Sequence, residues 1–308
     1  MSKIFVNDNA SQKFSGMIME EWTKQGHEVR FELGANPEVA QDWADIVFVD
    51  FLDNNAYCYF NNFTPIKKLF VRAIDIDVWM GRHRDPKFWN YISGLITISE
   101  PLYRKVQKEA LMDGCNIEDK LHLVRPGVDV DKFTFKKRNG STHKIAMVTG
   151  DFWEMKNYIE GFRIFQMLQL QDPGIPWELH IRGQHHSRDM EQVMKEHIVN
   201  RQTPGVFIYD QVDDMNEWYE DKDFILIPSL KEAFSYAGAE AMAKGIKPIF
   251  NNWWGSDTIW PKKYLYNNLF EALDMFKGEY NSEEYRQYIE ENYTLDRMMK
   301  GLNEVMSL

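Results

Sequence analysis

The sequence predicts an α/β protein built from two doubly wound domains, and three observations lead to this prediction. Short apolar runs typical of strands alternate with amphipathic segments typical of helices along most of the chain. Such alternation implies parallel sheets that are covered by helices on both faces. The chain has 308 residues, which is about twice the length of an average domain of roughly 150 residues. Near the middle, the polar stretch Lys136–Ser141 interrupts the alternation.

The predicted elements follow one another in a regular order. The strands expected in the first half are Ile4–Asn7, Ile46–Asp50, Leu69–Arg72, Leu95–Ile98 and Leu121–Val124. Those expected in the second half are Lys144–Val148, Glu178–Arg182, Val206–Ile208, Phe224–Ile227 and Pro248–Phe250. Helices are expected at residues 14–25, 100–110, 157–170, 188–200 and 235–244, where apolar residues recur every three or four positions. Beyond Trp260 and Pro261 no further strand is predicted, and only helical segments are expected through residue 308.

This order predicts a first domain over residues 1–136, a second over 137–265 and a helical tail over 266–308. The last helical segment, 281–306, is expected to cross back to the first domain. In open α/β sheets, ligands bind beyond the carboxyl ends of the strands. The cleft between two facing sheets is therefore the expected binding site.

Composition narrows the class of protein. Residues 1–138 hold 19 Lys and Arg against 20 Asp and Glu, and the remainder holds 17 against 27, so the net charge of −11 belongs mainly to the second half. No stretch approaches the roughly 18 consecutive apolar residues of a transmembrane helix, and the first residues read as a strand, so stable membrane insertion and a signal peptide are not expected. With only two cysteines, Cys58 and Cys115, the simplest setting is the reducing cytoplasm, or the host cytoplasm for a viral protein. The oligomeric state cannot be predicted.

The most informative stretch runs from Ile227 to Gly245. A buried strand ends at Pro228-Ser229, a short loop follows, and a helix opens near Ser235. Backbone N–H groups and the positive dipole end at a helix start suit a diphosphate. Glu232 in the loop could reach a sugar, and Glu240 on the helix could hydrogen-bond a ribose hydroxyl.

The segment Lys231–Gly245 resembles the E-x7-E signature of retaining glycosyltransferases with the GT-B fold, in the group called family 4. Val124–Phe133 resembles the N-G-V-D-x-x-x-F segment of that family, and Gly150–Asn157 resembles its G-R-x-x-x-x-K-N loop. Further matching segments in the same order are Leu179–Gly183, Val206–Val212 and Asp223–Ser229. The resemblance covers roughly residues 125–260 and is thinner before them. It implies two Rossmann-like domains that face a central cleft.

The resemblance also implies roles for single residues. Glu232 would contact the donor sugar, and Lys156 would neutralise the diphosphate charge that grows as the sugar–phosphate bond breaks. Glu240 would bind the ribose of a UDP- or GDP-linked donor. The backbone N–H groups of Phe234, Ser235 and Tyr236 would hold the distal phosphate, with Arg182, Gly183 and Val212 completing the donor site. No cofactor or metal is implied.

Two departures from the family pattern concern charge and acceptor chemistry. Asp151 stands where the family usually has an arginine, and Arg182 is the candidate to supply the missing charge. In the first half, Ile74 stands at the usual histidine position of an R-x-H-G-x-E segment. A catalytic or acceptor-side role would then pass to Asp75, with Arg72 and Asp77 beside the acceptor. Asp75-Ile76-Asp77 spells a metal-binding Asp-x-Asp motif, but its place in the first half argues against a metal–diphosphate role.

The acceptor is left open between a glycan, a small-molecule hydroxyl and a hydroxymethylated base in DNA, as in phage-type enzymes. Residues 57–91 mix cations with aromatic residues, a composition that suits a polyanion with stackable rings and suits sugars equally well. A catalytically inactive nucleotide-sugar-binding or scaffold protein with the same fold is the alternative, and a GT-B epimerase is a third reading.

Overall fold

The computed structural model describes residues 1–8, 12, 14–61, 68–151, 154–184, 203–209 and 212–308. The chain divides into two compact units. Unit 1 comprises Met1–Gly127 with Asp296–Leu308, and unit 2 comprises Val128–Leu295. Residues 128–136 therefore group with unit 2. The helix expected over residues 188–200 lies outside the described residues.

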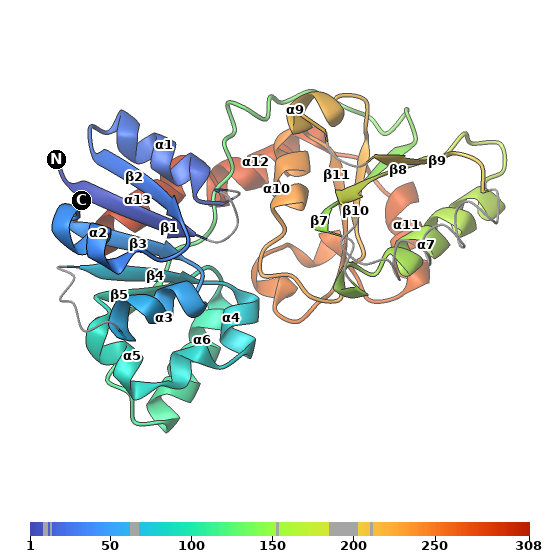
Figure 1. The fold of residues 1–308 in the computed structure, drawn as a ribbon. Coiled ribbons are helices and arrows are strands. Elements are labelled where there is room, and N and C mark those ends of the chain that lie inside the picture. Colours follow the sequence, from blue (N-terminus) through green and yellow to red (C-terminus); the bar gives the residue numbers. More distant parts are fainter. Residues whose placement is uncertain (9–11, 13, 62–67, 152–153, 185–202, 210–211) are drawn as a thin grey trace. The chain divides into compact units, whose positions relative to one another are not determined.

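Unit 1 contains a parallel six-stranded sheet in the order β2-β1-β3-β4-β5-β6 (Figure 1). The strands are β1 (Lys3–Asp8), β2 (Glu28–Leu33), β3 (Ile46–Asp50), β4 (Leu69–Ala73), β5 (Gly94–Thr97) and β6 (Leu121–Leu123). The helices are α1 (Gly16–Lys24), α2 (Pro37–Trp43), α3 (Asn54–Asn61), α4 (Asp75–Trp79), α5 (Pro86–Tyr91) and α6 (Glu100–Met112). The buried residues of β1, β3 and β4 give this sheet its apolar centre.

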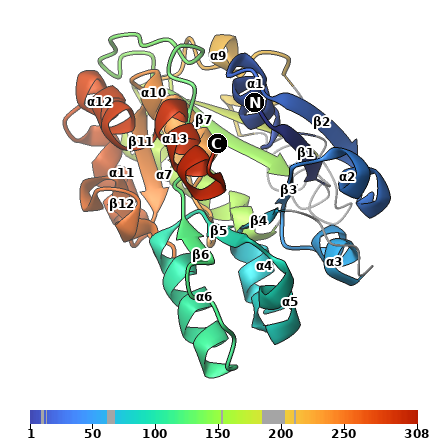
Figure 2. The ribbon, with the colours of Figure 1, turned by 90° about the vertical axis from the view of Figure 1, so that its left-hand side faces the viewer.

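The chain end belongs to unit 1. Helix α13 (Leu295–Met306) packs beside α1, where the Trp22 indole Nε1 donates to Asn303 Oδ1 at 2.9 Å (Figure 2). The predicted segment 281–306 is thus two helices, α12 (Ser282–Asn292) in unit 2 and α13 in unit 1, with a break at Tyr293-Thr294. At this break Val128 and Thr294 form a parallel bridge.

Unit 2 contains a second parallel six-stranded sheet, in the order β12-β11-β10-β7-β8-β9. The strands are β7 (Lys144–Asp151), β8 (Glu178–Gln184), β9 (Val206–Tyr209), β10 (Phe224–Ile227), β11 (Lys247–Asn251) and β12 (Leu265–Tyr266). Helices α7 (Tyr158–Gln171) and α11 (Leu269–Lys277) cover one face, and α10 (Tyr236–Ala243) and α12 cover the other. A short helix, α9 (Met215–Trp218), precedes β10. The prediction of two doubly wound α/β domains is confirmed.

Two strands escaped the sequence prediction. The expectation of no strand after Pro261 is wrong, because Leu265–Tyr266 pairs with Phe250 and Asn251 of β11. Two residues are too few to show the alternation that marks a strand. Strand β2 lies at the sheet edge, where a mixture of polar and apolar residues is tolerated.

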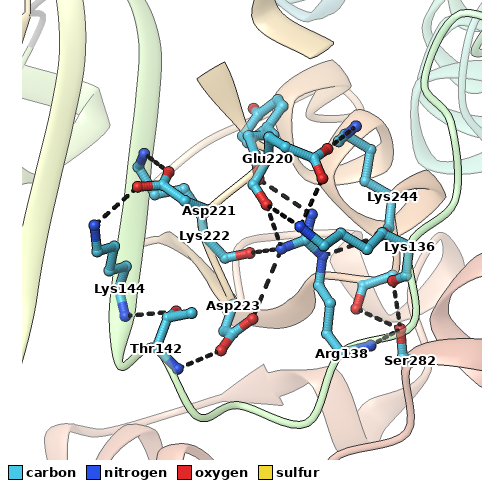
Figure 3. A network of polar contacts seen from close by, with 12 residues as sticks. Lys136, Arg138, Thr142, Lys144, Glu220, Asp221, Lys222, Asp223, Lys244 and Ser282 are labelled. Carbon is cyan, nitrogen blue, oxygen red and sulfur yellow. Dashed lines mark hydrogen bonds and ion pairs between the residues drawn. The ribbon is translucent and has the colours of Figure 1, made fainter. Parts of the chain in front are cut away.

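The polar stretch that interrupts the alternation is firmly anchored in unit 2. Arg138 is 9% exposed, and its guanidinium donates to the carbonyls of Lys222 at 2.7 Å, Glu220 at 3.0 Å, Lys244 at 3.2 Å and Tyr219 at 3.3 Å (Figure 3). These carbonyls lie just before β10 and just after α10. Arg138 therefore fastens the entering chain to the amino-terminal edge of the second sheet.

No helix in the described part of the chain is long and apolar enough to cross a membrane.

Candidate functional site

The strand order of unit 2 defines where a ligand should bind. Strands β7 and β10 are neighbours at the centre of the sheet, yet α7 and α10, which follow them, pack on opposite faces. The loops after the two strands therefore start side by side at the carboxyl edge of the sheet and lead to helices on opposite faces. Open α/β sheets bind ligands at such a point.

Lys156 and Glu232 meet at this edge of the sheet. Lys156 ends a short 3₁₀ turn after β7, and its Nζ lies 2.5 Å from Oε1 of Glu232, in the loop after β10. The same Oε1 accepts from Ser229 Oγ at 2.8 Å. The two side chains are 28% and 15% exposed, so the pair is partly shielded and still open to solvent. The structure thus brings together two residues that the sequence proposed for one site.

The backbone fixes these two loops to each other. Leu230 N donates to Met155 O at 2.8 Å, which joins the loop after β10 to the turn that carries Lys156. Asn251, at the end of β11, donates from Nδ2 to Ser229 O at 3.0 Å. Three parallel strands thereby hold the Lys156–Glu232 pair in place.

Helix α10 begins beside the pair with an unusual residue. Ser235 caps the helix in a left-handed conformation, with φ 77° and ψ 79°, and its Oγ accepts from Gly238 N at 3.4 Å. A side chain at Gly238 would meet the Phe250 ring at 2.7 Å, so glycine allows the helix to pack closely on β11. The backbone N–H groups at the start of a helix point away from the helix body and toward its amino end, which for α10 lies at Ser235 and Tyr236. They provide donors for an anion at the carboxyl edge of the sheet.

Glu240 and Arg182 both lie near the buried phenol of Tyr219. Burial raises the pKa of Tyr219 well above its usual value, the Glu240 carboxylate raises it further, and Arg182 opposes the shift. Tyr219 Oη donates to Ala237 O at 3.2 Å, one helical turn before Glu240. Arg182 and Glu240 thus both act on the same buried phenol, although they are far apart in the sequence. The sequence predictions did not include Tyr219, whose only signal is an aromatic residue ahead of a predicted strand.

Gly183 and Val212 border segments outside the described residues. Gly183 is buried near the end of β8, and Val212 is half-buried just after residues 210–211. The side chain of Asp151 also falls outside the description. Their roles in a donor site, and the effect of the acidic departure at position 151, stay predictions.

In unit 1, Arg72 and Asp77 are committed to contacts that stabilise the fold. Arg72 makes a bidentate ion pair with Asp50, with Nε–Oδ1 at 2.7 Å and Nη2–Oδ2 at 2.6 Å, and both side chains are buried. Asp77 Oδ2 accepts from the backbone N–H groups of Leu52 at 3.0 Å and Ile74 at 3.1 Å. Asp75, at the start of α4, is half-buried and is the more accessible of the two aspartates. An acceptor-side role for these residues stays a prediction.

The aromatic residues of segment 57–91 are divided between core and surface. Tyr59, Phe88 and Trp89 are at most 2% exposed, whereas Trp79 and Tyr91 are 50% and 47% exposed. His83 is also fully buried, and its Nε2 lies 2.8 Å from Glu109 Oε2. Fewer rings are therefore available to stack on bases than the sequence pattern indicated.

Comparison with known proteins shows what this chain is similar to. Residues 143–262 match the family model of the glycosyl transferases group 1. HepE from Anabaena, solved with UDP and glucose, superimposes with a TM-score of 0.74 at 11% identity over all of both chains. Sucrose-phosphate synthase from Thermosynechococcus elongatus gives a TM-score of 0.75 at 11% identity, over 100% of this chain and 98% of that one. The chain has the GT-B fold.

Two further similarities are partial in length. CapJ from Staphylococcus aureus is 27% identical over 161 residues, which are 51% of this chain and 40% of CapJ. The crystal structure of TarM matches with a TM-score of 0.65 and 14% identity, over 85% of this chain and 55% of TarM. The GT-B chain described here thus spans about half of TarM and less than half of CapJ. The segment matched by the family model lies within unit 2, and it includes both Lys156 and Glu232.

Proposed function

We propose that this GT-B protein is a glycosyltransferase that takes a sugar from a nucleoside-diphosphate donor and retains its anomeric configuration. The observation that carries the proposal is the Lys156–Glu232 contact of 2.5 Å beside the start of α10. A cation, a carboxylate and a helix amino end converge there at the topological switch point of the sheet. The match of residues 143–262 to the glycosyl transferases group 1 supports the same reading.

Each group in this corner has a task in the proposed reaction. The backbone N–H groups at residues 234–236 would bind the distal phosphate, and Lys156 would stabilise the negative charge that develops on it. Glu232 would accept hydrogen bonds from hydroxyls of the donor sugar. Glu240 would bind the ribose, and Arg182 would add a positive charge to the donor site.

The bond changes balance without an enzyme nucleophile. The bond between the anomeric carbon and the diphosphate oxygen breaks, and the acceptor oxygen bonds to that carbon on the same face. The proton of the acceptor hydroxyl passes to the departing phosphate oxygen. We propose that fixed cationic and N–H groups supply the charge stabilisation, so that the reaction runs without a metal ion.

For the acceptor we propose a glycan or a small molecule with a hydroxyl. The burial of Tyr59, Phe88 and Trp89 removes rings that a single-stranded or flipped-out base would stack on. A DNA acceptor makes a different prediction: binding to DNA would weaken steeply between two salt concentrations, because counterions are released from the phosphates. DNA binding with that salt dependence would replace the glycan acceptor in this proposal.

The experiment uses the intact chain with a panel of UDP-, GDP- and ADP-sugars. Thermal shift identifies the nucleotide, and release of free nucleotide measures turnover. Lys156→Ala should lower kcat by about 10²- to 10³-fold, the usual effect of losing one group that stabilises developing charge. Glu240→Ala should raise the Kd of the free nucleotide by about tenfold, because a charged hydrogen bond to the ribose is lost.

The chain offers a matched control in the exposed ion pair of Lys137 and Glu283, whose side chains are 74% and 63% exposed in the same unit. Lys137→Ala and Glu283→Ala should leave both kcat and the nucleotide Kd unchanged. Nucleotide binding without any turnover, with water or with an acceptor, would instead favour an inactive nucleotide-sugar-binding protein. Full activity in both Lys156→Ala and Glu240→Ala would remove the proposed site.

A further inference from the structure

The backbone just before α10 is held in an uncommon conformation. Ser235 has a φ of 77°, in the left-handed region that costs a residue with a side chain about 1 kcal/mol or more. Such a conformation persists only where its surroundings hold it. The residue before it, Phe234, is 2% exposed and is the obvious anchor.

The Phe234 ring packs against three aromatic rings of unit 2, two of which come from the part of the chain after β11. It stacks on Trp260 with the ring centroids 5.3 Å apart at an angle of 26°. The Tyr293 ring lies 5.0 Å from it and the Tyr236 ring 5.3 Å from it. Trp260 is itself 1% exposed. Stacked and edge-to-face pairs of this kind add about 1 kcal/mol beyond the buried area.

Two phenols fix the backbone that carries Trp260. Tyr293 Oη donates to the carbonyl of Ile259 at 3.0 Å, and Tyr288 Oη donates to the same carbonyl. Trp260 N also donates to Ser256 O at 2.8 Å. The indole is therefore held from its backbone as well as by its ring contacts.

The same tyrosine stands where the chain enters and leaves unit 2. Val128 N donates to Tyr293 O at 2.8 Å, and Leu295 N donates to Val128 O at 2.9 Å. A continuous set of contacts thus runs from this crossing through Tyr293 and Trp260 to Phe234, next to the Ser235 backbone. Nothing in the chemistry of the proposed donor site requires these residues to touch a ligand.

We propose that Trp260 is a positioning residue for the donor site: its ring, braced by Tyr288 and Tyr293, keeps Ser235 left-handed and aims the N–H groups of residues 234–236 at a diphosphate. This proposal deepens the proposed function and rests on it. Without the stack, Phe234 can withdraw, Ser235 can relax to an ordinary conformation, and the N–H groups turn away from the anion. Misplacement of such groups by about 1 Å is enough to weaken binding or catalysis substantially.

The test measures UDP affinity and thermal stability of the intact chain in three variants. Trp260→Leu should weaken UDP binding about tenfold, which equals about 1.4 kcal/mol. Trp260→Phe retains a stacking ring and should recover most of that affinity. Trp177 is 5% exposed in the cluster on the other face of the sheet. Trp177→Leu should therefore lower the melting temperature comparably and leave the Kd of UDP unchanged.

A second pair of variants keeps every ring in place. Replacing both phenols, as Tyr288→Phe with Tyr293→Phe, should weaken UDP binding several-fold. Tyr285→Phe, also on α12, removes a hydroxyl that accepts from Asn281 N at 2.9 Å and does not touch Ile259, so its UDP affinity should be that of the wild type. These variants decide the matter if Trp260→Leu does not fold.

The outcomes separate the two proposals. If the wild-type chain binds none of the nucleotides, the proposed function fails. If the wild type binds UDP and the Trp260 and tyrosine variants bind it equally well, the positioning role is overturned while the donor site stands. Equal losses of UDP affinity in Trp177→Leu and Trp260→Leu would also overturn it, since the effect would then follow from stability alone.

Discussion

At the scale of single residues, the proposed donor site centres on the contact between Lys156 and Glu232, which joins two loops of unit 2. Lys156 and Glu232 were proposed from their motifs, but their contact joins positions far apart in sequence and depends on which strands are neighbours. The ion-pair partner of Arg72 could have been predicted from the sequence. Asp50 and Arg72 are the last residues of two predicted strands, and they are register partners in the sheet. Aligning the ends of those two strands as neighbours in a parallel sheet would have placed the Asp50 carboxylate beside the Arg72 guanidinium.

The burial of the Asp77 carboxyl leads to a prediction about how the free energy of unfolding depends on pH. Burial raises its pKa from 3.8 to about 6, against the lowering effect of the N–H groups of Ile74 and Leu52 and of Arg82. The folded state therefore binds this proton more tightly than the unfolded state does. Between pH 4 and 6, roughly, the free energy of unfolding should fall as pH rises, by up to about 3 kcal/mol from this group alone.

Urea unfolding of the wild type and of Asp77→Asn at several pH values checks this. The amide oxygen can still accept from the backbone, but it cannot ionise, so the fall should be absent from the variant. Asp42→Asn, at an exposed position of α2, should follow the wild-type profile. Parallel profiles for the wild type and Asp77→Asn would show that Asp77 does not titrate in this window.

At the scale of elements, long runs with clear periodicity were predictable and conformational exceptions were not. The central strands of both sheets are buried on both faces and appear in the sequence as continuous apolar runs. The left-handed cap at Ser235 has no such signal, because serine is a common cap in ordinary conformations. The bridge between Val128 and Thr294 also has no sequence signal, because it joins two single residues and not two strands.

The segment that carries Arg138 illustrates the same limit. Its run of polar residues predicts a flexible connection, whereas the guanidinium is buried and serves four backbone carbonyls (Figure 3). Those partners are main-chain atoms that any residue could supply. The pattern of side chains in the sequence therefore could not predict these contacts.

This anchor predicts a loss of stability. Arg138→Ala leaves several buried carbonyls without their donor and leaves Asp223, 3.7 Å from the guanidinium, without its cation. The free energy of unfolding should drop by about 3 kcal/mol, as measured by urea denaturation followed through tryptophan fluorescence. The neighbouring Lys137→Ala, at an exposed ion pair, should cost less than about 1 kcal/mol. Similar costs for the two variants would show that Arg138 is not an anchor.

For the whole molecule, the alternation of strands and helices was enough to predict two doubly wound units and a GT-B resemblance. Boundaries were harder. The units divide at Gly127-Val128 and again at Leu295-Asp296. Neither crossing is marked by a change in amino-acid composition. The second crossing was anticipated only as a general return of the last helical segment.

The net charge of each unit shows that long-range electrostatics do not favour nucleotide binding. Unit 2 holds 19 Lys and Arg against 27 Asp and Glu, a net charge of −8, while unit 1 holds 17 against 20, a net charge of −3. The overall field of unit 2 opposes an anionic nucleotide. Binding must therefore come from donors fixed at short range, namely Lys156 and the start of α10.

The most direct test is a crystal structure of the protein with UDP or with the nucleotide selected by the thermal-shift panel. The account predicts a diphosphate within hydrogen-bonding distance of Lys156 Nζ and of the N–H groups at residues 234–236, with the ribose on Glu240. A nucleotide bound elsewhere, with this corner of unit 2 empty, would contradict it.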